Sequence, residues 1–164
     1  MDSQVNQLID IINQEISSLE HFLVLLSDEQ DFLVNHEVNA LEKSVRDQEE
    51  AISQAEKLER TRIKLTNAIA EKLSLDTNRI TLSKLIQLLE ESYSTKLMEL
   101  QKDLLDLYKK VERQRRKNEF LIKQSMGYID KSMQILLGTG MVDFTYLKSG
   151  KKEKRPQVLM NQVG

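Results

Sequence analysis

The chain has 164 residues, a formal net charge of −2 and no cysteine, a length that suits one domain or one elongated helical unit. The absence of cysteine excludes disulfide bonds, cysteine-ligated metals and thiol nucleophiles. Eight aromatic residues and no Trp argue against a large globular core. The amino-terminal residues lack the charge pattern of a signal peptide, and no apolar run approaches about 18 residues. The sequence therefore predicts a soluble, cytoplasmic protein without membrane insertion.

Charge is distributed unevenly along the chain. Residues 1–60 hold 14 acidic and 4 basic residues, a net charge of −10, whereas residues 61–164 hold 12 acidic and 20 basic residues, a net charge of +8. Segments of opposite sign attract each other when a chain folds back on itself, and each segment can also attract an oppositely charged partner. The simpler interpretation is antiparallel packing within the chain.

A first helix is predicted over about 3–26, because no glycine or proline precedes Gly127 and such a composition is typical of long helices. Its apolar residues alternate in steps of four and three, the heptad spacing of a helix that packs along one seam. These residues are Val5, Ile9, Ile12, Ile16, Leu19, Leu23 and Leu26. Ser27 and Gln30 fit a capping box that begins a second helix. A continuous helix through this point is the alternative.

The second helix is predicted over about 28–74. Its seam changes phase after Ala55, and Arg62 then occupies a seam position. The seam residues are Val38, Leu41, Val45, Gln48, Ile52, Ala55, Leu58, Arg62, Leu65, Ile69 and Leu73. Asp76, Thr77 and Asn78 predict a turn, with Thr81 as the N-cap of the next helix.

The third helix is predicted over about 81–137. Its seam consists of Leu82, Ile86, Leu89, Tyr93, Leu97, Leu100, Leu104, Leu107 and Val111. Gln114 and Asn118 continue the same phase with polar side chains. If the helix pairs antiparallel with the second one, it extends beyond its partner, so its end packs on the first helix or protrudes. Residues 138–164, rich in Gly and Lys, predict a flexible basic tail.

Together these elements predict an all-α fold, an elongated antiparallel coiled-coil-like bundle of two or three long helices, with one helical domain over 1–137. No catalytic constellation is found, so we expect no enzyme activity. The segment HEVNA at 36–40 has Ala40 where a helical zinc motif needs its second His, so we expect no metal and no cofactor. Six bases within 109–117 are a pattern that can indicate nucleic-acid binding. Five of them, Lys109, Lys110, Arg113, Arg116 and Lys117, lie opposite Leu107 and Val111, which favours an ordinary solvated face.

The end of the third helix has more apolar residues than one buried face needs. One stripe consists of Ile122, Met126, Ile129, Met133, Leu136 and Leu137, and a second of Leu121, Tyr128 and Ile135. Together they span an arc of roughly 200° at 100° per residue. Two interpretations remain: a three-helix core that covers both stripes, or a surface that binds an amphipathic partner helix.

Four segments of the sequence resemble the FlgN family of bacterial flagellar export chaperones, and the similarity runs nearly from end to end. They are KLERTRIKL at 57–65, ITLSKL at 80–85, RKNEFLIKQSMGYIDKSMQIL at 116–136 and FTYLKSG at 144–150. The resemblance implies an all-helical, cytoplasmic chaperone without catalytic activity. It also implies binding of the C-terminal helical segments of the hook-filament junction proteins FlgK and FlgL, which prevents premature assembly, and delivery to the export gate.

The resemblance also implies which residues contact the partners. Carried over, the cargo surface comprises Asn118, Leu121, Ile122, Met126, Ile129, Met133 and Leu136, to which the second stripe adds Tyr128 and Ile135. Tyr146 corresponds to the tail tyrosine associated with docking on the gate protein FlhA, although Leu147 replaces the usual Asp. The alternatives are a structural coiled-coil rod or tether without cargo and a nucleic-acid binder. The sequence leaves open whether the chain forms a homodimer.

Overall fold

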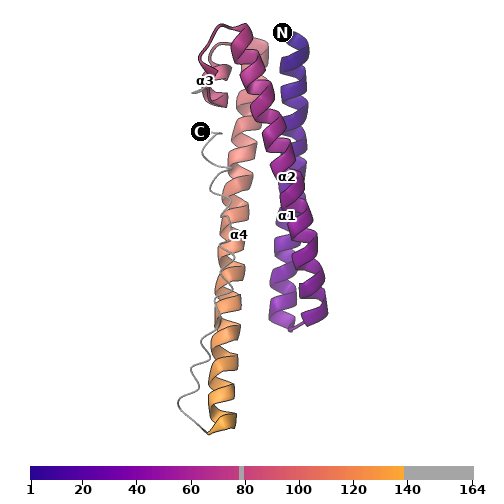
Figure 1. Ribbon diagram of the computed structural model, residues 1–164, viewed down its shortest axis with the longest axis vertical. Helices are drawn as coiled ribbons and strands as arrows, with labels where there is room; N and C mark the ends of the chain where they lie inside the picture. Colours follow the sequence, from indigo (N-terminus) through magenta and orange to yellow (C-terminus); the bar gives the residue numbers. More distant parts are fainter. Residues whose placement is uncertain (78–79, 139–164) are drawn as a thin grey trace.

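The computed structural model describes residues 1–77 and 80–138 and contains four helices, with no strand in this part of the chain. They are α1 (Asp2–Asn35), α2 (Val38–Lys72), α3 (Leu82–Ile86) and α4 (Glu91–Leu137). The structure is elongated: α1 and α2 form an antiparallel hairpin, α4 runs beside it, and the short α3 lies at the end that holds the N-terminus (Figure 1). The predicted all-α bundle is confirmed.

The predicted break at residue 27 is wrong, because α1 continues through it to Asn35. The buried face of α1 continues beyond Leu26, because Glu29 is also buried. This packing favours one uninterrupted helix. The turn lies instead at His36, whose φ of 56° is left-handed. His36 N donates to Leu33 O (3.4 Å) and Glu37 N donates to Phe32 O (2.9 Å), which is a Schellman motif that satisfies the last carbonyls of the helix.

The second turn follows α2, as predicted, and leads into α3. Thr81 is the N-cap of α3, and its hydroxyl accepts a hydrogen bond from the Lys84 backbone N–H at 3.3 Å. The predicted single helix over 81–137 is divided, because α3 ends at Ile86 and α4 begins at Glu91. Leu82, Leu85 and Ile86 are buried in the core, and this tertiary packing outweighs the helix-favouring composition of residues 87–90.

The apolar core is concentrated near the N-terminus, where all four helices contribute. α1 is the central helix, because it packs against both α2 and α4. The best-buried apolar side chains are Val5, Leu8, Ile12, Ile69, Leu82, Leu85, Leu97 and Leu104. The predicted seams of the first and third helices are thus confirmed as core positions. We call this half of the molecule the closed end, and the half that holds the α1–α2 turn the open end.

A buried polar cluster joins three helices between these two ends. Arg62 of α2 is 1% exposed, and its Nε donates to both carboxylate oxygens of Glu15 on α1, at 3.0 and 2.9 Å. Glu59 lies beside the same guanidinium, with a 3.8 Å contact. Burial raises the pKa of the Glu59 carboxyl, as it does that of the Tyr108 phenol on α4. The ion pair fixes the register of α1 and α2, since displacement of either helix leaves a buried charge unpaired.

The first half of the predicted α2 seam is not part of the core. Val38, Val45 and Ile52 are exposed, whereas the small residues Ser44 and Ala51 are buried. Over this half of α2 the side that faces the bundle is therefore rotated away from the predicted stripe. Small side chains let two helices approach closely, and this packing leaves the larger apolar residues uncovered.

Candidate partner-binding surface

The end of α4 extends beyond the turn between α1 and α2, as Figure 1 shows. The reason is length: α4 has 47 residues, whereas α1 has 34 and α2 has 35. α4 ends at Leu137, and its C-cap Gly138 has a φ of 61°, a left-handed conformation that glycine adopts without strain. We call residues 120–137 the projecting end of α4.

Asn118 anchors α4 to α1 at the base of the projecting end. Its side-chain amide donates to the Leu26 backbone oxygen and to the Glu29 carboxylate, both at 2.7 Å. Gln114 extends this contact by donating to Gln30 and to Asn118. Asn118 is 2% exposed, and it is the last buried residue of α4. The polar seam positions therefore hold the two helices together.

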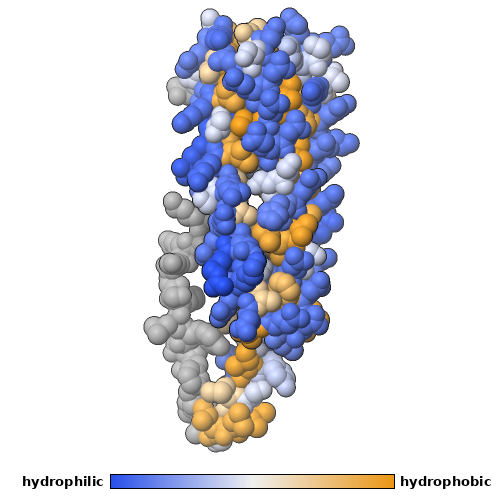
Figure 2. All heavy atoms as spheres, turned by 90° about the vertical axis from the view of Figure 1, so that its right-hand side faces the viewer, coloured by the Kyte–Doolittle hydropathy of each residue, from blue (hydrophilic) through white to orange (hydrophobic). Residues whose placement is uncertain are grey.

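Beyond Asn118, most residues of the two predicted stripes are exposed. Ile135 and Leu136 are each 80% exposed, and the tip of the molecule is apolar in Figure 2. The other exposed members are Ile122, Tyr128, Ile129, Met133 and Leu137, while Leu121 and Met126 are half-buried. A three-helix core that covers both stripes is thus excluded, and the projecting end presents an apolar surface on more than one side.

The structure changes the composition of the predicted surface at two residues. Asn118 belongs to the α1–α4 contact and lies outside the exposed surface. Phe120, 60% exposed, belongs to it and was missed, because neither stripe includes its position. The only signal for Phe120 is a large apolar side chain outside the seam. Tyr146 lies outside the described residues.

Ion pairs within α4 support the helix where it leaves its neighbours. Glu112 accepts hydrogen bonds from Arg115 at 3.0 and 3.1 Å and from Arg116 at 3.0 Å, and these bonds lower the pKa of its carboxyl. Lys123 pairs with Glu119 at 2.8 Å. Pairs at three- and four-residue spacing stabilise a helix locally, so two bases of the 109–117 stretch already have a structural role.

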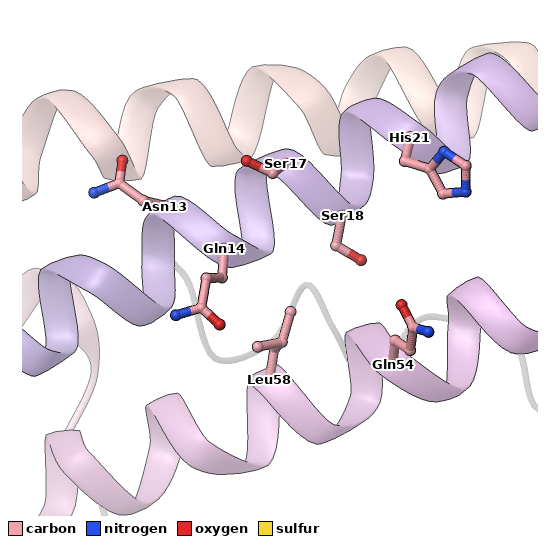
Figure 3. Close-up of a pocket in the computed structure, with 7 residues that line it drawn as sticks. All are labelled: Asn13, Gln14, Ser17, Ser18, His21, Gln54 and Leu58. Carbon is pink, nitrogen blue, oxygen red and sulfur yellow. The ribbon is translucent and has the colours of Figure 1, made fainter.

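A groove between α1 and α2 is lined mainly by amides and hydroxyls. Gln14 and Ser18 point from α1 toward Leu58 and Gln54 of α2 (Figure 3). The remaining lining residues are Asn13, Ser17 and His21. This lining has neither the apolar character of most small-molecule sites nor a nucleophile beside a base. We therefore do not consider it the functional site.

The described residues contain neither a cluster of metal-ligating side chains nor a membrane-spanning helix. Over residues 1–77 and 80–138, no group of three or more His, Asp or Glu side chains is placed to hold a metal ion. Among the same residues, no helix has an apolar stretch long enough to cross a bilayer. The projecting end of α4 thus remains the main candidate.

Comparison with known proteins gave one match. The model of the family described as FlgN protein matches residues 1–154. No curated protein matches the chain, and no solved structure matches it. The match includes all four helices, so the long, unpartnered end of α4 lies within the matched region.

Proposed function

Because the chain belongs to the FlgN family of flagellar export chaperones, we propose that the projecting end of α4 binds the C-terminal helical segments of the junction proteins FlgK and FlgL. Bound cargo cannot assemble prematurely, and the chaperone then delivers it to the export gate. This is the activity of a binding protein, and it requires no catalytic residue.

The observation that carries the proposal is the uncovered apolar surface of residues 120–137. Exposed apolar area costs roughly 25 cal/mol per Å² relative to burial, and contiguous patches of this kind mark interaction sites. Ile129 and Met133 lie one turn apart on one stripe, with Tyr128 and Ile135 beside them on the other. A partner helix that lies along α4 buries apolar side chains at this spacing, as in other helix-recognition complexes.

The composition of the projecting end suits a partner that must later be released. Met126 and Met133 have flexible, polarizable side chains that adapt to different apolar surfaces. Gly127 faces open space on the side where another residue would have its side chain. It therefore has no packing role in the free chain, and a cargo helix can approach the backbone there.

Delivery to the gate is the second part of the proposal. By family resemblance Tyr146 docks on FlhA, and the basic residues that follow it extend the same tail. Because residues 1–138 contain the cargo surface, a chain that ends at Gly138 is expected to retain FlgK and FlgL and to lose FlhA. Loss of cargo upon this truncation would contradict the assignment of separate surfaces.

The cargo surface is tested by a pair of matched variants. Ile129→Ala with Met133→Ala removes apolar contacts from the projecting end, and Val24→Ala with Val34→Ala removes similar exposed groups from α1. In a pull-down with a peptide from the FlgK C-terminus, we expect the first variant to lose at least about tenfold in affinity, or 1.4 kcal/mol. The second is expected to bind like the wild type.

Two controls make the result interpretable. The far-UV circular dichroism of both variants should equal that of the wild type, because the substituted side chains are exposed. Wild-type affinity of the Ile129→Ala, Met133→Ala variant would contradict the proposal. Light scattering with and without the peptide distinguishes the chaperone from a structural rod. A stable higher oligomer that does not bind the peptide would favour a rod, whereas a homodimer that dissociates on binding would fit a chaperone.

A further inference from the structure

A second uncovered apolar stripe lies on α2. Val38, Val45 and Ile52 are 64%, 46% and 44% exposed, and they are spaced by seven residues. Leu41 and Ala55 are half-buried beside them, so the stripe is continuous with the face that packs on α1. Seven-residue spacing along a helix is the pattern that contacts another helix lying lengthwise against it. From Val38 to Ile52 the stripe covers about four helical turns.

A row of glutamates borders this stripe. Glu42, Glu49 and Glu56 each follow a stripe residue by four positions, which places them along one edge, and all three are exposed. Glu56 contacts Arg60 at 3.5 Å, whereas no ion pair links Glu42 or Glu49 to another described residue. Residues 38–56 contain five acids and two bases, so the edge has a net negative charge.

We propose that this acid-edged stripe of α2 is a second docking surface, which binds an amphipathic helix whose apolar side is flanked by Lys or Arg. In helix pairs, the apolar positions supply most of the buried area, and charges at the flanking positions select the partner and its orientation. The unpaired carboxylates of Glu42 and Glu49 therefore specify a basic partner helix. An acidic helix is rejected by like charge.

The location of the stripe suggests how it combines with the cargo surface. α2 begins at the α1–α2 turn, at the open end of the molecule, from which α4 also projects (Figure 1). The two surfaces share no residue, so a basic helix can be held on α2 independently of the apolar surface on α4. This inference does not rest on the identity of the cargo.

Methyl NMR of the full chain with a designed peptide tests the proposal. The peptide has three heptads, with Leu at the two apolar positions and Lys at the flanking ones; a second peptide has Glu in place of Lys. We expect the Lys peptide to shift the methyl resonances of Val38, Val45 and Ile52, and the Glu peptide to leave them unchanged. The methyls of Ile129 and Ile135 report the α4 surface in the same spectrum and should not move.

Charge-reversed variants measure how much the glutamates contribute to the affinity for the peptide. We expect Glu42→Lys with Glu49→Lys to lower the affinity for the Lys peptide at least tenfold and to raise the affinity for the Glu peptide. Asp10→Lys with Glu20→Lys makes the same change in net charge on exposed positions of α1, and it should leave the affinity within about twofold. An equal loss in both variants would show general charge attraction and overturn the proposal.

Other occupants of the stripe have distinct outcomes. Shifts of the Val45 and Ile52 methyls that grow with protein concentration, without peptide, would identify a second copy as the occupant. Shifts of these methyls when the chain is shortened to end at Gly138 would identify the C-terminal tail. Movement of Ile129 and Ile135 alone would place the peptide on α4. Each of these results would overturn the proposal, and the pull-down with FlgK peptide would still test the cargo surface separately.

Discussion

The closed and open ends of the molecule use similar helical patterns with opposite results. At the closed end, α1 packs against α2 and α4, α3 packs against α4 and α2, and Leu8, Leu85 and Leu97 are fully buried. At the open end, α4 extends beyond the α1–α2 hairpin, and the apolar residues of its projecting end are exposed to solvent. The same spacing thus builds a core where a third element is present and an exposed apolar surface where none is.

The helix contacts also differ between the two ends. The closed end is held by apolar packing, whereas the last contact between α1 and α4 is polar, through Asn118 and Glu29. Polar contacts contribute modest net stability but demand specific geometry. The open end is therefore fixed in register while its apolar surface stays available.

The largest predicted effect concerns the cluster between the two ends. Arg62→Ala leaves the buried Glu15 carboxylate without its partner, and we expect a loss of about 3–5 kcal/mol in the free energy of unfolding. Urea unfolding followed by circular dichroism measures it. A double change, Glu15→Leu with Arg62→Met, should recover most of the loss, because it removes both charges. A loss below about 1 kcal/mol for Arg62→Ala would contradict a structural role for the pair.

The next prediction compares the two ends directly. Leu104→Ala creates a cavity at the closed end and is expected to cost about 2–5 kcal/mol of unfolding free energy. Ile135→Ala at the open end should change it by less than about 0.5 kcal/mol, because an exposed side chain loses little packing. Both are measured in the same urea series. Similar losses would mean that the projecting end is packed in the free protein.

A smaller effect is expected at the polar anchor. Asn118→Ala removes the donor shared by Leu26 and Glu29 and leaves a buried carboxylate oxygen without this partner, at a cost of about 1–3 kcal/mol. Lys117→Ala, on the exposed side of the same turn, is the control and should cost less than about 0.5 kcal/mol. If the two variants unfold alike, Asn118 does not anchor α4.

The smallest predicted effect is a pH dependence at Glu59. Burial raises its pKa above the usual 4.5, so the folded state binds the proton more tightly than the unfolded state. This contribution to stability is complete below pH 4.5 and is lost as pH rises through the raised value. Relative to Glu59→Gln, the wild type should therefore gain stability as pH falls from about 7.5 to about 5. Thermal unfolding measures the difference, and parallel curves would contradict it.

Periodicity predicted most of the helical fold but could not separate covered from uncovered stripes. The seams through Leu19 and Leu104 and the N-cap at Thr81 were predicted correctly from spacing and capping chemistry. Ser27 and Gln30 carry the same capping signal, yet α1 passes through them because its buried face continues. Seven-residue spacing is the same for Leu104 in the core and Val45 at the surface, and only the lengths and positions of neighbouring helices distinguish them.

The candidate surface was predicted in part, for the same reason. An apolar arc wider than one helix contact identified residues 121–137, and their exposure depends on where α1 and α2 turn. Asn118 was recognised as a polar seam position, but its partner Glu29 could not be found from sequence. The buried site of that glutamate depends on the continuation of α1 beyond residue 26.

Hydrogen exchange of the full chain, with and without a peptide from the FlgK C-terminus, tests the central claim most directly. In the free protein, the amides of the projecting end should exchange faster than those of α4 at the closed end, because no neighbouring helix restrains them. Bound peptide should slow exchange over residues 120–137 and leave the amides around Leu104 unchanged. Protection confined to the closed end, or absent from residues 120–137, would contradict the assignment of this surface to cargo.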